Sequence, residues 1–197
     1  MRHLTLSAFL LLAAGGIAMA QTPPAPGRGG PRPPPLMLSS PAIQDGGIVP
    51  DKYTAAAGPN AVTPPLAWTN IPATAQSLVL IVHDVDVVMQ RGLGDNPHWI
   101  VFNIPTTTTS LAEGLPHTAT LPDGAVQMSR PRRGGAPATA GYFPFAPPPG
   151  FVHHYDFDLY ALDTKLPLDT NATRAQIEGA MAGHVVGKAV LQTRFKR

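Results

Sequence analysis

The sequence contains no cysteine. Disulfides, cysteine nucleophiles and thiolate metal ligands are therefore excluded together, and the folded state depends on a packed core. Charge is also sparse, since 12 acidic and 14 basic residues give a formal net charge of +2. No basic stripe interleaved with aromatic residues is present, so we expect no nucleic-acid partner. The arginines gathered at Arg130, Arg132 and Arg133 are interpreted as a solvated loop.

Hydrophobic runs long enough to span a bilayer are missing too. The first segment, residues 1–20, has a basic Arg2, an apolar run over residues 4–14 and a small-residue end over residues 18–20. This order is typical of a secretory signal peptide, and the apolar run is shorter than the roughly 20 residues that a membrane-spanning helix needs. We therefore expect a periplasmic or secreted protein from which residues 1–20 are removed. A retained, uncleaved anchor is the alternative.

Proline and glycine are abundant, with 24 and 19 residues respectively. They are concentrated in residues 21–36, which lack large apolar side chains until the end of the segment and predict a disordered or polyproline-like lead. The remaining residues, 37–197, suffice for one domain with a sizeable core. We expect a single folded domain there.

Four segments of this domain carry strand patterns. Residues 77–86 and 98–105 are continuous apolar runs, which are typical of strands buried on both faces. Residues 153–162 alternate between polar and apolar side chains, so we expect one face of this strand to meet solvent. Residues 184–195 predict a last strand near the C-terminus.

Only residues 172–183 have a clear helical pattern. Thr173 and Gln176 form a capping box, and Gly183 stands where a residue just past the helix end is expected. Many strands, frequent turn residues and one late helix predict a mainly β fold with a largely antiparallel sheet. The long connections over 87–97 and 129–150 are of a length that is usually functional or mobile.

The alternation of side chains along each strand assigns polar residues to its faces. Polar side chains that fall on otherwise apolar faces, near strand ends, are Asp84, Asp86, His98, His153 and Tyr155. An unpaired buried polar group costs about 1–3 kcal/mol, so we expect these groups to meet one another or a shared ligand at one end of the sheet. His154 falls with Asp156 and Asp158 on the opposite, solvent-facing side.

Such a pocket has the donors for an anion. Imidazole N–H and phenol O–H groups donate to phosphate oxygens, while an aspartate accepts from a ligand ammonium or orients a histidine. This mixture favours a zwitterionic head group such as phosphoethanolamine over a bare phosphate. Two imidazoles and a carboxylate also suit zinc, but no helical HExxH-type spacing supports a metal site, and we expect none.

Catalysis has less support than binding. No nucleophile elbow surrounds Ser77 or Ser110, and no cysteine is present. Acid–base chemistry by Asp84 or Asp86 with His98 stays open, although no motif names a reaction. The sequence favours a protein that is not an enzyme and uses no cofactor.

Several segments, in this order, resemble one known family. They are IQDGGIVPDKYT (43–54), TPPLAWTNIP (63–72), SLVLIVHDVD (77–86), PHWIVFNIP (97–105), GYFPFAPPPGFVHHYDFDLYALD (141–163) and GHVVGKAVLQTRF (183–195). With them the chain resembles the phosphatidylethanolamine-binding protein family, in the bacterial branch often described as Raf kinase inhibitor-like. The resemblance implies a large antiparallel sheet packed with a smaller sheet, one or two peripheral helices and a small anion pocket near one end.

The resemblance assigns the same pocket residues as the strand alternation does. The family's D-x-D pair falls on Asp84 and Asp86, its pocket histidine on His98, and its H-x-Y on His153 and Tyr155. The expected function is therefore an exported binding protein for a small phosphorylated or zwitterionic ligand such as phosphate or phosphoethanolamine.

The chain departs from the family pattern at three places. Val85 replaces the proline of Asp-Pro-Asp, which we expect to loosen the local backbone. Tyr142 is followed by residues 143–145, Phe-Pro-Phe, instead of a Gly-Pro pair, which bears on the pocket entrance and the ligand size. The C-terminal helix that eukaryotic members carry beside the pocket is not expected here, so the mouth should be more open.

Two other functions stay open. The resemblance suggests an inhibitor or interaction protein, and export then favours a protease outside the cytoplasm over a kinase as its target. A metal-dependent hydrolase, suggested by the histidines and carboxylates and not by the resemblance, is the other. A homodimer and contact with a membrane both stay open, and no groove for acyl chains is visible in the sequence.

Overall fold

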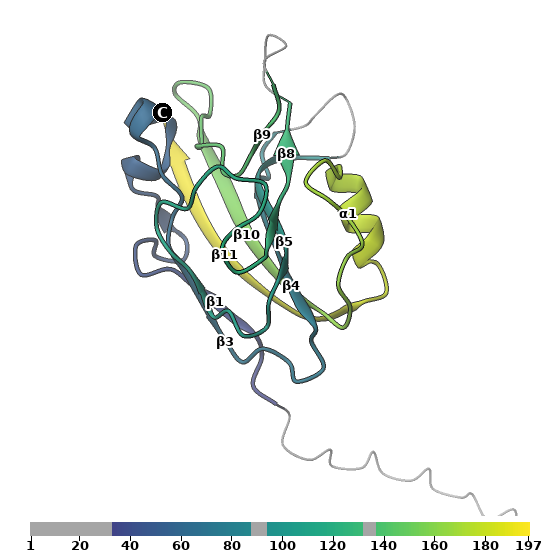
Figure 1. Cartoon of the computed structure of the whole chain (residues 1–197). Helices are drawn as coiled ribbons and strands as arrows, with labels where there is room; N and C mark the ends of the chain where they lie inside the picture. Colours follow the sequence, from purple (N-terminus) through teal and green to yellow (C-terminus); the bar gives the residue numbers. More distant parts are fainter. Residues whose placement is uncertain (1–32, 88–93, 132–136) are drawn as a thin grey trace, which may run out of the picture. The chain divides into compact units, whose positions relative to one another are not determined.

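The computed structural model describes residues 33–87, 94–131 and 137–197 (Figure 1). The chain divides into two units, Met1–Pro33 and Pro34–Arg197, and the architecture described below belongs to the second. The expected signal peptide over 1–20 and most of the expected lead over 21–36 lie outside the described residues. Within the described ranges, no helix combines the length and the apolar character needed to cross a membrane.

The domain is built on a six-stranded sheet. Its strands, in spatial order, are β2 (Gly47–Ile48), β11 (Val185–Lys196), β10 (Val152–Leu162), β4 (Ser77–Asp84), β5 (Asn96–Ile104) and β7 (Val126–Gln127). All neighbours pair antiparallel except β2 and β11, which pair parallel at one edge. The predicted mainly β fold with a large, largely antiparallel sheet is confirmed.

Two smaller sheets and three short helices complete the described part of the domain. A three-stranded sheet has the order β1 (Met37–Ser39), β3 (Leu66–Thr69) and β6 (Ser110–Leu111), and a two-stranded sheet joins β8 (Ser129–Arg130) and β9 (Thr139–Ala140). The helices are the 3₁₀ turns η1 (Asp51–Tyr53) and η2 (Ala55–Asn60) and the α-helix α1 (Arg174–Met181).

The large sheet is covered on both faces. One hydrophobic core joins its strands to the three-stranded sheet, as with Leu80 of β4 and Trp68 of β3. A second core joins the opposite face to α1, as with Ile81 of β4 and Ile177 of α1 (Figure 1). All eight residues of β4 are buried, as its continuous apolar run predicts.

The helix α1 begins and ends where its sequence signals indicate. The Thr173 hydroxyl accepts from the Gln176 backbone N–H at 3.3 Å, and the Gln176 side chain accepts from the Thr173 backbone N–H at 2.8 Å, so the capping box is formed. Gly183 follows the C-cap with φ of 83°, a left-handed conformation that favours glycine. The helix prediction is confirmed.

The expected solvent-facing side of β10 is only partly exposed. Asp158 is buried, with 7% of its surface accessible, although its neighbours His154 and Asp156 on the same face are more open. The prediction is wrong for Asp158 because the face is covered by the second core near α1, and because Lys188 of the neighbouring strand β11 bonds to this carboxylate at 2.8 Å.

Candidate functional site

A cavity of about 720 Å³ lies where strands β4, β5 and β10 bring their polar residues together. Residues that line it include Asp84, Asn96, His98, Arg130, Phe143 and His153. Three of the five residues expected at a ligand site, Asp84, His98 and His153, therefore share one cavity. The antiparallel pairing explains this, because the end of β4 lies beside the starts of β5 and β10.

Asp84 and His153 form a buried, directly bonded pair. The His153 Nδ1 lies 2.7 Å from Asp84 Oδ2, and Asp84 Oδ1 accepts the Asp86 backbone N–H at 3.0 Å. Because a carboxylate only accepts, Nδ1 of His153 carries the proton in this contact. Asp84 thus orients the ring, and the remaining nitrogen, Nε2, is the atom that His153 has for a ligand: it accepts from a ligand ammonium when the ring is neutral and donates to an anion when the ring is an imidazolium.

His98 is held as a neutral ring in the cavity wall. Its Nδ1 lies 2.7 Å from the Phe143 carbonyl oxygen, and its Nε2 lies 3.1 Å from Asn96 Nδ2. Burial lowers the pKa of His98 to about 4, so the imidazole is neutral at physiological pH. Nδ1 then donates to Phe143 and Nε2 accepts from Asn96, so in this arrangement His98 holds no further N–H for an anion.

Tyr155 lies behind these histidines with an unused hydroxyl. Its ring stacks on Phe145 with centroids 3.8 Å apart and meets His98 edge-on at 5.4 Å. The buried hydroxyl has no hydrogen-bond partner among the described residues. Burial, reinforced by the nearby Asp84 carboxylate, raises the pKa of Tyr155 well above its usual range, so this group stays an O–H donor.

Asp86 lies apart from the cavity lining. Its Oδ2 accepts the His154 backbone N–H at 2.6 Å and lies 2.9 Å from His154 Nδ1, and both side chains are about 40% exposed. Burial raises the pKa of Asp86, but the hydrogen bonds from the His154 backbone and side chain outweigh it and lower the pKa overall. Strand alternation does not extend to Asp86, because β4 ends at Asp84.

Val85 extends the backbone pairing at the end of β4. Its backbone N–H donates to the His154 carbonyl oxygen at 3.2 Å, a bond that a proline at this position could not make. The replacement thus adds one rung to the pairing with β10, and the expected loosening of the backbone stays a prediction.

The Phe-Pro-Phe segment closes one side of the cavity. The Phe143 backbone N–H donates to the His98 carbonyl oxygen at 2.8 Å, and the Phe143 carbonyl oxygen accepts from the His98 ring at 2.7 Å. Phe145 is fully buried against Tyr155. Phe143 and Pro144 also line a second hollow of about 280 Å³. The Phe-Pro-Phe segment is thus hydrogen-bonded to β5 through Phe143 and packed into the aromatic core through Phe145.

Arg130 is a charged cavity residue that sequence reasoning missed. It lies on β8, where Nη1 donates to the Pro97 carbonyl oxygen and Nη2 donates to Asn96 Oδ1, both at 2.6 Å. Its guanidinium also lies 5.1 Å from the Phe143 ring centroid. The solvated-loop interpretation is wrong for Arg130, while Arg132 and Arg133 lie outside the described residues. Only the length of the connection over 129–150 hinted at a role.

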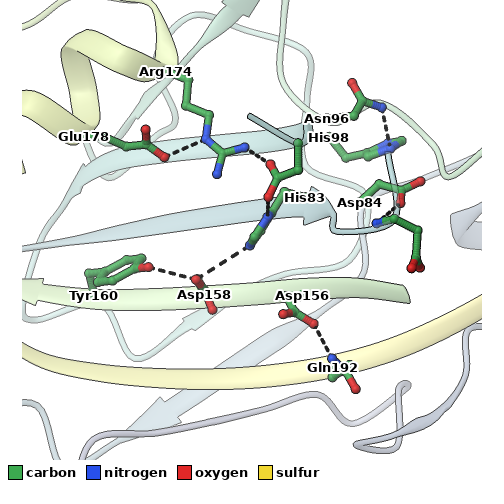
Figure 2. A network of polar contacts seen from close by, with 12 residues as sticks. His83, Asp84, Asn96, His98, Asp156, Asp158, Tyr160, Arg174, Glu178 and Gln192 are labelled. Carbon is green, nitrogen blue, oxygen red and sulfur yellow. Dashed lines mark hydrogen bonds and ion pairs between the residues drawn. The ribbon is translucent and has the colours of Figure 1, made fainter. Parts of the chain in front are cut away.

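A second polar network occupies the opposite face of the same strands (Figure 2). His83 Nδ1 lies 2.5 Å from Asp95 Oδ2, and Arg174 of α1 pairs with the same carboxylate. The His83 Nε2 lies 3.6 Å from Asp158 Oδ2. Burial alone lowers the pKa of His83, but the contacts with Asp158 and Asp95 outweigh it and raise the pKa overall. The ring is thereby favoured as a cation between two carboxylates.

Among the described residues, no group of three or more histidine, cysteine or acidic side chains is arranged to hold a metal ion. The polar atoms of the cavity bond to one another instead, as in the Asp84–His153 pair.

The fold and the cavity define a β-sheet domain with a histidine-lined polar pocket at the end of its main sheet. The family model described as phosphatidylethanolamine-binding protein matches residues 39–196. The chain belongs to the phosphatidylethanolamine-binding protein family.

Relatives and solved structures agree with that membership. A UPF0098 protein of Methanothermobacter thermautotrophicus is 41% identical over 162 residues, covering 82% of this chain and 99% of the relative. The UPF0098 protein YbhB of Escherichia coli is 32% identical, covering 68% and 81%. The structure of a Chlamydia trachomatis homologue of phosphatidylethanolamine-binding protein superposes with a TM-score of 0.69 at 35% identity, covering 83% and 98%. Escherichia coli YbcL gives the same TM-score at 26% identity, covering 82% and 98%.

Proposed function

We propose that this protein is an exported, non-enzymatic binding protein whose pocket holds a phosphate or phosphoethanolamine-type group. The observation that carries the proposal is a polar cavity in which Asp84 orients the His153 ring, with Tyr155 packed edge-on against the lining residue His98. The buried Tyr155 hydroxyl has no hydrogen-bond partner among the described residues. A buried donor without a partner is costly, and a ligand oxygen would satisfy it.

A binding role fits the cavity better than a covalent reaction. No serine, threonine or lysine is among the described residues that line it, so no side-chain nucleophile faces the Asp84–His153 pair. Activation of a water by His153 is the reaction that this geometry would otherwise support. A phosphatase assay with a chromogenic monoester tests that alternative, and we expect no turnover above the uncatalysed rate.

Native mass spectrometry tests the proposed ligand class directly. The protein is sprayed as purified and again after incubation with phosphate or phosphoethanolamine. We expect a saturable adduct of the added ligand's mass, in a one-to-one ratio, which is displaced by an excess of the other ligand. Absence of any saturable adduct with either compound would refute the proposal.

Export is tested separately from binding. Its support is the composition of residues 1–20, which combine a basic start, an apolar run and a small-residue end. We expect cell fractionation to place the protein outside the cytoplasm and N-terminal sequencing to begin near Gln21. Recovery of the full-length chain from the cytoplasm would refute export without bearing on the pocket.

An interaction with another protein is the second candidate function. Phe151 and Val152 are 64% and 46% exposed immediately before His153, so apolar surface adjoins the pocket. Exposed apolar residues of this kind often mark contact sites. A partner whose capture survives His153→Ala but is lost in Phe151→Ser would support this function, and loss in both variants would assign the capture to the pocket.

A further inference from the structure

Arg130 is fixed in place before any ligand binds. Its two bonds to Pro97 and Asn96, each of 2.6 Å, join β8 to the start of β5, and its guanidinium lies 5.1 Å from the Phe143 ring centroid. An arginine restrained in this way loses little side-chain freedom on binding, so its charge is pre-organised. The planar guanidinium also suits two oxygens of one phosphate group.

Asp84 and His98, two other polar groups of the pocket, already make hydrogen bonds within the protein through all of their oxygen or ring nitrogen atoms. Both oxygens of Asp84 accept hydrogen bonds, from His153 and from the backbone N–H of Asp86. Both nitrogens of His98 are used, and the low pKa of that ring keeps it neutral. Among the described residues that line the cavity, the permanent positive charges are the guanidinium groups of Arg130 and Arg197.

This charge pattern distinguishes between two kinds of phosphate. A phosphate monoester carries a charge of about −1.5 to −2 at neutral pH because its second pKa is about 6. A phosphodiester, such as a lipid head group, lacks that second ionisation and has only one negative charge and two free oxygens. Coulomb attraction grows with ligand charge, so a pocket in which the guanidinium groups of Arg130 and Arg197 outnumber the carboxylate of Asp84, itself bonded to His153, favours the monoester.

We propose that Arg130 makes this pocket selective for phosphate monoesters and inorganic phosphate over phosphodiesters. The inference rests on the proposed anion-binding function of the same site and specifies its ligand class. It also assigns a binding role to a residue outside the D-x-D, H and H-x-Y motifs. The selectivity favours a soluble phosphorylated compound over the head group of an intact phospholipid.

Isothermal titration of the whole protein at pH 8 tests the proposal with three probes. They are inorganic phosphate, phosphoethanolamine as a monoester, and glycerophosphoethanolamine as the diester of a lipid head group. We expect the wild type to bind both monoester-type probes at least about tenfold more tightly than the diester. We expect Arg130→Met to weaken monoester binding about 10- to 100-fold and diester binding less, so that the ratio falls toward one.

Two further variants separate charge from structure. Arg130→Lys keeps the charge and loses the planar fork, so the ratio should lie between those of the wild type and Arg130→Met. Lys165→Ala removes an exposed positive charge outside the cavity lining and should leave all three affinities unchanged. Circular dichroism and thermal unfolding verify that each variant is folded, and Arg130→Lys carries the test if Arg130→Met does not fold.

The outcomes separate the two proposals. If the wild type binds none of the probes, the proposed anion-binding function is refuted, and the role of Arg130 with it. If the wild type binds but prefers the diester, the selectivity role of Arg130 alone is refuted. The same conclusion follows if every folded Arg130 variant keeps the wild-type ratio of monoester to diester affinity.

Discussion

His83 and Asp84 are neighbours on β4 whose side chains take part in separate networks on opposite faces of the sheet. Asp84 bonds to His153 in the pocket at 2.7 Å, whereas His83 bonds to Asp95 at 2.5 Å on the side of α1. On the other face of this strand end, His83, Asp95 and Arg174 form a charged network (Figure 2). The two networks can therefore be altered separately by substitutions at adjacent positions of one strand.

The network on the side of α1 should contribute strongly to stability through Asp158. This buried carboxylate accepts from Lys188 Nζ and the Tyr160 hydroxyl, both at 2.8 Å, and lies beside His83. Burial raises the pKa of Asp158, but these partners outweigh it and lower the pKa to about 2. We expect Asp158→Asn to reduce the free energy of unfolding by about 3 kcal/mol, measured by urea denaturation at pH 7.

Asp156→Asn is the matched control on the same strand and face. Asp156 is more exposed and accepts one side-chain bond, from Gln192 at 2.7 Å. A change within about 0.5 kcal/mol is expected there. Equal effects of the two substitutions would show that the buried network contributes nothing particular to stability.

His98 should make the protein sensitive to mild acid. Its pKa is about 4 in the folded state, below the ordinary value of 6.5, because the ring is buried. As pH falls from 6.5 toward 4, the unfolded chain takes up a proton that the folded chain does not, so stability decreases by up to about 3 kcal/mol. Above pH 6.5 this contribution is fully present.

Urea denaturation at several pH values between 4.5 and 7.5 measures that dependence. The variant His98→Gln lacks the titrating ring, so its stability should fall less steeply than that of the wild type below pH 6.5. The difference between the two proteins cancels the contributions of His83 and the carboxylates, provided that these are unchanged. Parallel pH profiles for the two proteins would contradict the assignment of acid sensitivity to His98.

Gly141 should not tolerate a side chain. Its φ is +102°, and a Cβ atom there would lie 3.0 Å from His117 Nδ1 and 3.4 Å from Gln127 Oε1. We expect Gly141→Ala to destabilise the fold by about 1–3 kcal/mol in thermal or urea unfolding. Gly179→Ala, in the exposed interior of α1 with no atom within 4 Å, should instead stabilise by up to about 1 kcal/mol. The same sign for both changes would contradict this account.

Much of the fold is readable from local sequence patterns. The continuous apolar run of β4 predicted burial on both faces, and Thr173 with Gln176 predicted the start of α1. Strand alternation predicted that His98 and His153 lie together, and both line one cavity, because alternation holds wherever the strand is regular. These successes concern interactions that are local or that repeat along one strand.

The failures concern positions where the chain leaves regular structure or where distant segments meet. Asp86 was assigned by alternation, but β4 ends before it and its carboxylate turns to His154. Asp158 was expected in solvent because no local pattern reveals the cover that α1 and Lys188 provide. Arg130 was missed because its partners, Asn96 and Pro97, are 34 and 33 residues away in the sequence.

The adjacent histidines on β10 allow the most direct test of the central claim, that the pocket binds an anion through His153. Titration with phosphoethanolamine should give saturable binding in the wild type and in His154→Ala, whose side chain pairs with Asp86 outside the cavity lining. The same titration should give binding weakened at least about tenfold in His153→Ala, which removes the ring held by Asp84. Undiminished binding by a folded His153→Ala protein, or equal losses in both variants, would contradict the claim.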